Sequence, residues 1–187
     1  MTFNHIMVDL ETTGVMPDRN GIIQIAAYRF GLKEGEIDPT PFNRCLFVPA
    51  WRSWDLGTLK WWRQDAQMRE TLANIESRAE DPATVIAAFR DWVFQGEGKP
   101  IFWSKPSHFD WGFLQSSFKD FSMEMPFHYR FANDMNSYIR GAWHPLEMVE
   151  QKVEMHGAAH DAVYDVLNQI QVLWASLKAA EQAHADQ

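Results

Sequence analysis

Cysteine is nearly absent from this chain of 187 residues, which contains only Cys45. A single cysteine excludes an internal disulfide framework and is typical of proteins in a reducing compartment. Long hydrophobic runs are also missing, because no stretch approaches the ~20 apolar residues of a membrane span. The chain does not open with a basic segment followed by an apolar run, as a secretory signal would. We therefore expect a soluble, cytoplasmic protein that has no membrane partner.

Positive charge is scarce as well, since 17 Lys and Arg face 25 Asp and Glu for a net charge of −8. Such a balance argues against tight, non-specific binding of long nucleic acids, although bound metal ions could offset clustered acids locally. With 46% hydrophobic and 14% aromatic residues, the chain is globular rather than disordered. Its length suits one domain, which we place at residues 1–180, and we expect residues 181–187 to form a frayed tail.

Apolar spacing predicts an α/β domain with three early strands followed by alternating helices and strands. The expected strands cover residues 5–11, 22–30, 42–48, 101–103 and 128–133. The expected helices cover residues 58–64, 67–75, 82–94, 108–118 and 162–180. This order indicates a mixed five-stranded sheet flanked by helices.

The first strand, HIMVDLET, contains two acids among apolar residues. Asp9 and Glu11 are two apart, so they project from the same face of the strand, while the apolar residues between them face the core. Two neighbouring carboxylates repel each other, and each loses free energy when it is removed from water. Either the pair ends an exposed edge strand, or it binds a divalent cation that offsets the repulsion.

Two later segments supply further acids. Asp110 lies in SHFDWGFL, where Ser107 and Asp110 also match a helix capping box, so Asp110 can cap a helix, face a cleft or do both. In HDAVYD, Asp161 and Asp165 share one face of the expected last helix, and His160 directly precedes it. The helix dipole alone could explain Asp161, and a histidine at this place is often structural.

A pair of tryptophans, Trp61 and Trp62, lies beside Lys60 and Arg63. Aromatic side chains among basic ones suit the stacking of bases and contact with phosphates. The alternative is an amphipathic helix with a tryptophan in the core. Because adjacent helical residues point about 100° apart, at least one of the two is expected to be buried.

Together the acids and the histidine form a recognisable chemical set. Carboxylates favour hard cations such as Mg²⁺ or Mn²⁺, and two such ions about 3.5–4 Å apart can stabilise the attacking and leaving oxygens of a phosphodiester. A histidine beside them can take the proton from the attacking water.

The motifs DLETTG, FD and H-x4-D, in this order, resemble those of the DEDDh exonucleases, which have a ribonuclease H-like fold. The segment GTLKWWRQDAQMRETL is most similar to the exonuclease VIII-like, phage and small bacterial exoribonuclease branch. The resemblance implies that two divalent cations, Mg²⁺ or Mn²⁺, are held by Asp9, Glu11, Asp110 and Asp165. It implies His160 as the general base, and it makes the substrate-binding candidates Leu10, Thr12, Trp61 and Trp62.

The implied function is a metal-dependent 3′-5′ exonuclease that releases nucleoside 5′-monophosphates from single-stranded RNA or DNA ends. Ser104 and Ser107 stand where many members have an Asn, which indicates a different positioning of the substrate. The acidic charge favours distributive action on short ends. The alternatives are a nucleotide or dinucleotide phosphohydrolase and a non-catalytic nucleic-acid-binding module of the same fold. Family members include monomers and dimers, so a homodimer is compatible with the resemblance.

Overall fold

The computed structural model describes residues 3–96, 98–157 and 160–187. One sheet organises the fold, with the strand order β4-β3-β2-β1-β5-β6. Its strands are β1 (His5–Thr12), β2 (Ile22–Phe30), β3 (Phe42–Leu46), β4 (Ala79–Glu80), β5 (Ile101–Ser104) and β6 (Ala132–Asp134). The helices are α1 (Leu56–Trp62), α2 (Ala66–Ser77), α3 (Pro82–Phe94), α4 (Ser107–Asp120), the 3₁₀ turn η1 (Tyr129–Phe131), α5 (Met135–Trp143) and α6 (Ala162–Ala185).

The predicted mixed sheet flanked by helices is confirmed, but it has six strands rather than five. β1, β2 and β3 pair antiparallel, whereas β1–β5, β5–β6 and β3–β4 pair parallel. The additional strand, β4, has two residues, which is too short to leave an alternation pattern in the sequence. β1 lies between β2 and β5, so the strand that carries the acid pair is central and not an edge strand.

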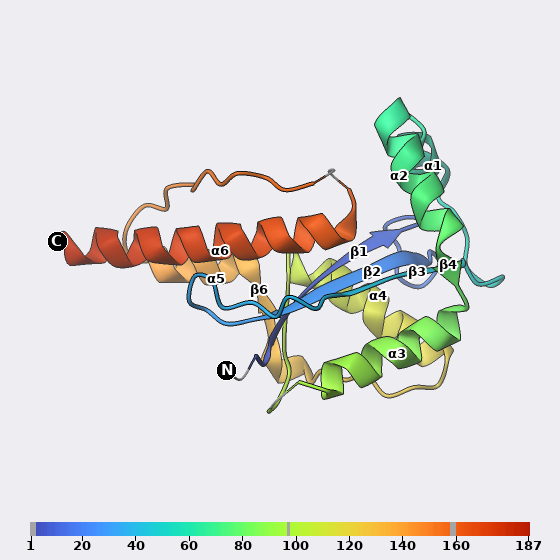
Figure 1. The fold of residues 1–187 in the computed structure, drawn as a ribbon, viewed down its shortest axis with the longest axis horizontal. Helices are drawn as coiled ribbons and strands as arrows, with labels where there is room; N and C mark the ends of the chain where they lie inside the picture. Colours follow the sequence, from blue (N-terminus) through green and yellow to red (C-terminus); the bar gives the residue numbers. More distant parts are fainter. Residues whose placement is uncertain (1–2, 97, 158–159) are drawn as a thin grey trace.

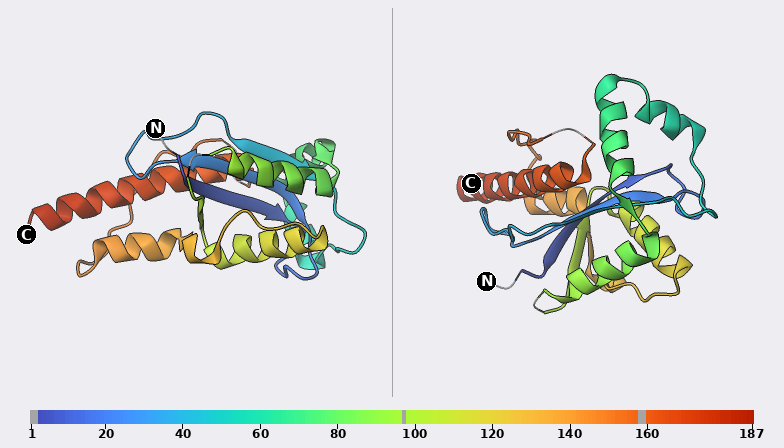
Figure 2. Two further views of the ribbon diagram at one scale, coloured as in Figure 1. Left: turned by 90° about the horizontal axis from the view of Figure 1, so that it is seen from below. Right: turned by 45° about the vertical axis from the view of Figure 1, so that its right-hand side comes forward.

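Helices cover both faces of the sheet (Figures 1 and 2). Ile6, Val8 and Leu10 of β1 pack on the side of α3 and α4, as their alternation predicted. Met7 packs in a second core with α5 and α6 on the opposite side. The odd-numbered residues of β1 therefore face α6, which brings the acid pair toward the start of that helix.

Most of the predicted boundaries agree with the structure to within about two residues, and three parts of the chain differ more. α6 continues through Ala185, so residues 181–185 are helical rather than a frayed tail. Within residues 128–133, expected as a strand, His128 precedes η1, Tyr129–Phe131 form η1, and Ala132 and Asn133 begin β6. α5 was missed because it has only nine residues, although its buried residues Met135, Ile139 and Trp143 recur every four positions, as on one face of a helix.

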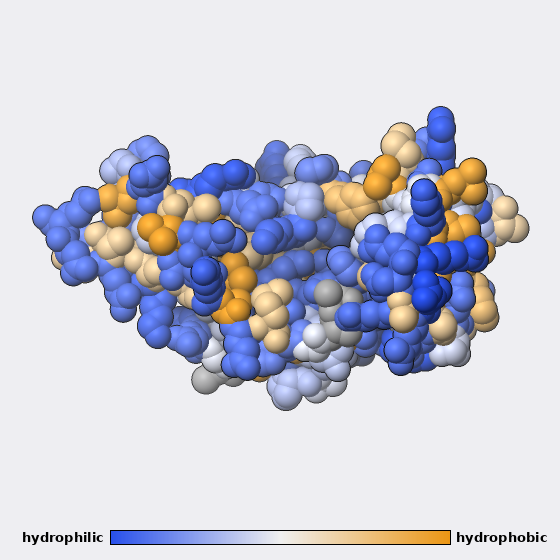
Figure 3. All heavy atoms as spheres, turned by 90° about the horizontal axis from the view of Figure 1, so that it is seen from above, coloured by the Kyte–Doolittle hydropathy of each residue, from blue (hydrophilic) through white to orange (hydrophobic). Residues whose placement is uncertain are grey.

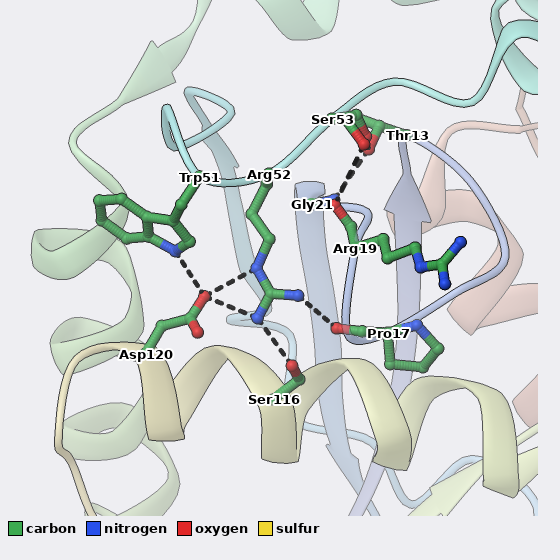
Figure 4. A network of polar contacts seen from close by, with 9 residues as sticks. All are labelled: Thr13, Pro17, Arg19, Gly21, Trp51, Arg52, Ser53, Ser116 and Asp120. Atoms are coloured by element: carbon green, nitrogen blue, oxygen red, sulfur yellow. Dashed lines mark hydrogen bonds and ion pairs between the residues drawn. The ribbon is translucent and has the colours of Figure 1, made fainter.

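The segment that leads into α1 is fastened to two other parts of the fold (Figure 4). The Arg52 side chain, only 5% exposed, donates to Asp120 at 2.8 Å, to Ser116 at 2.7 Å and to the Pro17 carbonyl. The Thr13 hydroxyl donates to the Ser53 carbonyl at 2.7 Å. These bonds tie the segment to α4 and to the β1–β2 loop, and so they hold α1 beside the end of β1.

The face shown in Figure 3 is largely hydrophilic, and hydrophobic side chains emerge on it in separate small clusters. No helix within the described residues is long and apolar enough to cross a membrane.

Candidate active site

Asp9 and Glu11 lie side by side on the central strand, and Glu11 is only 9% exposed. Burial raises the pKa of Asp9 well above its usual range, and the charges of Asp110 and Asp165 raise it further. The pKa of Glu11 is raised for the same reasons, first by burial and then by the charge of Asp9. The pair is therefore held in an environment that disfavours negative charge.

Asp110, in the first turn of α4, belongs to the same cluster. The capping-box alternative is wrong, because α4 begins after Pro106 without any side-chain cap. The Ser107 backbone N–H instead donates to Asp134 at 3.0 Å. Asp110 is 3% exposed, and burial raises its pKa to about 7. Its carboxylate also lies close enough to Asp9 for its charge to raise the pKa of Asp9.

The two acids near the start of α6 have different environments. Asp161 is the N-cap, and its carboxylate accepts from Gln24 Nε2 at 2.8 Å, so its contacts explain it as a helix anchor. Asp165 lies one turn further on, accepts from the His160 backbone N–H at 3.1 Å, and has a pKa raised by burial. Geometry thus separates the two acids, which sequence spacing alone did not.

Glu11, His160 and Asp165 each offer a ligand atom, and these atoms lie within 4.8 Å of one another. His160 has a φ of +64°, a left-handed conformation that is uncommon for a residue with a side chain. Among the described residues, neither Lys nor Arg pairs with any of the four clustered acids. The cluster is rich in oxygen atoms, and its acids are buried or half-buried. It therefore has the donor chemistry that suits a hard divalent cation.

A pocket of about 460 Å³ opens beside this cluster, between the end of β1 and α1. Glu11 connects the pocket to the acids. Its lining includes all four predicted substrate-binding candidates, Leu10, Thr12, Trp61 and Trp62. Sequence reasoning missed Phe109, Thr58 and Val15, which also line it. The available signal for Phe109 was its place directly before the acid of the FD motif.

The two tryptophans differ in burial. Trp62 is fully buried in the core beneath α2, and its indole N–H approaches the Thr12 carbonyl at 3.5 Å. Trp61 remains 36% exposed, and its ring centroid lies 4.8 Å from that of His160. The prediction that at least one tryptophan belongs to the core is confirmed, and Trp61 is the one that borders open space.

Residues 4–177 match the protein family described as the 3′-5′ exoribonuclease Rv2179c-like domain. The chain belongs to this family. Comparison with curated protein sequences finds no match. This family is an exoribonuclease family, so the resemblance to DEDDh exonucleases that the three motifs indicated is confirmed. The family match also confirms the prediction of an enzyme rather than a binding module.

Solved structures of exonuclease I share the fold of this exoribonuclease domain. The complex of Escherichia coli exonuclease I with a dT13 oligonucleotide is 17% identical with a TM-score of 0.70, and the match covers 97% of this chain and 42% of that one. The zinc-bound complex of the same enzyme with single-stranded DNA is 16% identical with a TM-score of 0.69, covering 96% and 41%. The chain therefore spans less than half the length of these relatives.

Proposed function

We propose that this domain removes nucleoside 5′-monophosphates from the 3′ end of single-stranded RNA, with Asp9, Glu11, Asp110 and Asp165 as metal ligands and His160 as general base. The family supports RNA as the substrate. Distributive action on short ends fits a chain with a net charge of −8, which lacks the basic excess that long polymers require.

One observation carries the proposal. Four carboxylates from β1, α4 and α6 meet at one place, and burial raises the pKa of each. A protein that needed only stability would place apolar residues there, since clustered buried acids destabilise the fold. Two divalent cations, Mg²⁺ or Mn²⁺, would remove that cost and would supply charge stabilisation to the scissile phosphate when bound.

The side chains of the protein would supply proton transfer and substrate binding. The His160 imidazole lies beside Glu11 and Asp165, where it can accept the proton of an attacking water. The adjoining pocket combines the apolar side chains of Leu10, Phe109 and Trp61, which suit a nucleobase. We assign the terminal nucleotide to this pocket, with its 3′ hydroxyl toward Thr12.

The test is a cleavage time course on 5′-labelled single-stranded RNA and DNA of equal sequence, with Mg²⁺, Mn²⁺ or EDTA. We expect a metal-dependent ladder that shortens from the 3′ end of RNA. Asp165→Asn should abolish the ladder, whereas Asp161→Asn should retain it, because Asn also caps helices well. Equal loss in both variants would contradict the assignment of Asp165. Cleavage of mononucleotide or dinucleotide phosphates alone would favour a phosphohydrolase.

A further inference from the structure

Gln169 contacts the acid cluster without belonging to it. It lies on α6, and its Nε2 donates to Asp9 Oδ1 at 2.8 Å. Among the described residues, Gln169 is the side chain that donates a hydrogen bond to the Asp9 carboxylate, and it is neutral. Asp9 therefore receives a directed donor rather than a counter-charge.

The spacing of two elements explains why an amide stands here. Two residues along a strand advance about 6.6 Å, and four residues along a helix advance about 6 Å. Asp9 and Glu11 on β1 are two apart, and Gln169 and Asp165 on α6 are four apart, so the helix presents one group to each acid. Asp165 shares a cation-sized space with Glu11, while Gln169 binds Asp9. A carboxylate at 169 would add a fifth negative charge.

The other end of the amide is also informative. The Oε1 atom of Gln169 is buried, and no described group donates to it. A side chain selected for packing alone would not bring an unpaired carbonyl into this place, since a buried acceptor without a donor is unfavourable. The hydrogen bond from Nε2 to Asp9 therefore explains why an amide side chain occupies position 169.

We propose that Gln169 is a positioning residue that fixes the orientation of the Asp9 carboxylate for cation binding. The inference rests on the proposed function, because it assumes that Asp9 is a metal ligand. Hydrogen-bond partners that orient ligands are important in metal sites, and their removal typically lowers metal affinity or activity by about 10–100-fold.

The experiment compares Gln169→Leu, which removes the donor at similar size, with Gln169→Glu, which keeps the length but replaces the donor with an acceptor. Gln182→Leu is the matched control, because Gln182 lies on the same helix and is exposed. Mn²⁺ affinity is measured by electron paramagnetic resonance, and kcat and KM are measured on a short 5′-labelled RNA. Circular dichroism in EDTA checks that each variant is folded.

For Gln169→Leu we expect Mn²⁺ affinity and kcat to fall about tenfold or more, with KM within about twofold. Gln169→Glu should lose at least as much kcat, and Gln182→Leu should match the unmodified protein. Mn²⁺ affinity and kcat within about twofold in both Gln169 variants would overturn the proposal. Asp9→Ala separates the two claims: if it is inactive while both Gln169 variants are normal, only the positioning role fails. If Asp9→Ala remains active, the proposed function fails as well.

Discussion

The exposed indole of Trp61 packs edge-on against the His160 imidazole, with ring centroids 4.8 Å apart and an interplanar angle of 80°. This contact joins two segments that are about a hundred residues apart in sequence. It places α1, which lines the pocket, in direct touch with the residue that we propose as general base. Asp165 bonds the backbone N–H of His160, and Trp61 is the aromatic neighbour that packs against its ring.

Trp61→Ala should therefore reduce catalysis more than stability. We expect kcat to fall about tenfold, because the imidazole loses a wall that orients it, and KM to rise, because the pocket loses an aromatic surface. Trp61→Phe should recover most of both. Steady-state kinetics on a short RNA check this, and unchanged kinetics in Trp61→Ala would exclude the contact from the reaction.

Trp62→Ala should show the opposite balance. Trp62 is fully buried, and removal of a buried tryptophan side chain costs about 3–5 kcal/mol. We expect the free energy of unfolding in urea to drop by that amount. A loss below about 1 kcal/mol would mean that Trp62 is less important to the core than its burial indicates.

The stability of the metal-free protein should depend on pH through Asp110. Its pKa rises from an ordinary 3.8 to about 7 on folding, so the folded state retains a proton that the unfolded state releases between these values. The associated stability is complete below about pH 4 and is lost as the pH rises through about 7, by up to about 1.4 kcal/mol per pH unit for one proton.

Thermal unfolding in EDTA should thus occur at a higher temperature at pH 5.5 than at pH 8. Asp110→Asn should reduce this difference, because an amide does not titrate. Added Mg²⁺ should stabilise the protein more at pH 8, where its ligands are ionised. An apo protein that is more stable at pH 8 than at pH 5.5 would contradict the raised pKa.

The sequence predicted the bounds of helices and strands well where the apolar segment was long. β2 at Ile22–Phe30 and α3 at Pro82–Phe94 match their predicted bounds. The prediction failed for α5, whose helical spacing extends over only nine residues, and for β4, which has only two residues. β4 forms because Ala79 and Glu80 pair with β3, and two residues are too few for an alternation pattern to predict this pairing.

The residues of the candidate site could also be predicted from the sequence only in part. The five clustered groups could be selected from motif order, because each motif carries its own acids. What distinguishes the environment of Asp161 from that of Asp165 is the bond from Gln24, which lies 137 positions from Asp161 in the sequence. Gln169 and Phe109 were missed for the same reason, since their roles depend on which element packs against β1.

The Arg52 network is expected to hold α1 in place. Arg52→Met removes the donors to Asp120, Ser116 and Pro17 and leaves Asp120 without its cation. Because the Asp120 side chain is 21% exposed, we expect a loss of about 2–3 kcal/mol, below that of a fully buried pair. Urea unfolding of Arg52→Met, Asp120→Asn and the double variant should reveal a coupling, and purely additive losses would contradict it.

Gly157 offers a test of how His156 and Gly157 are held against α6. The Asn168 side chain bonds both the N–H and the carbonyl of His156, at 2.8 and 3.2 Å. Gly157 follows with a φ of +64°, and a Cβ there would lie 2.1 Å from the Tyr164 ring. Gly157→Ala must therefore displace this segment or Tyr164.

Gly35→Ala is the matched control, because Gly35 has a φ of +85° but no atom within 4 Å of the added Cβ. It should lose about 1–2 kcal/mol of stability from backbone strain alone and keep full activity. Gly157→Ala should lose more stability, because the contact adds to the strain, and its kcat should fall because Tyr164, which directly precedes Asp165 in α6, must shift. If the two variants behave alike in both urea unfolding and RNA cleavage, the packing of Gly157 against Tyr164 contributes to neither stability nor catalysis.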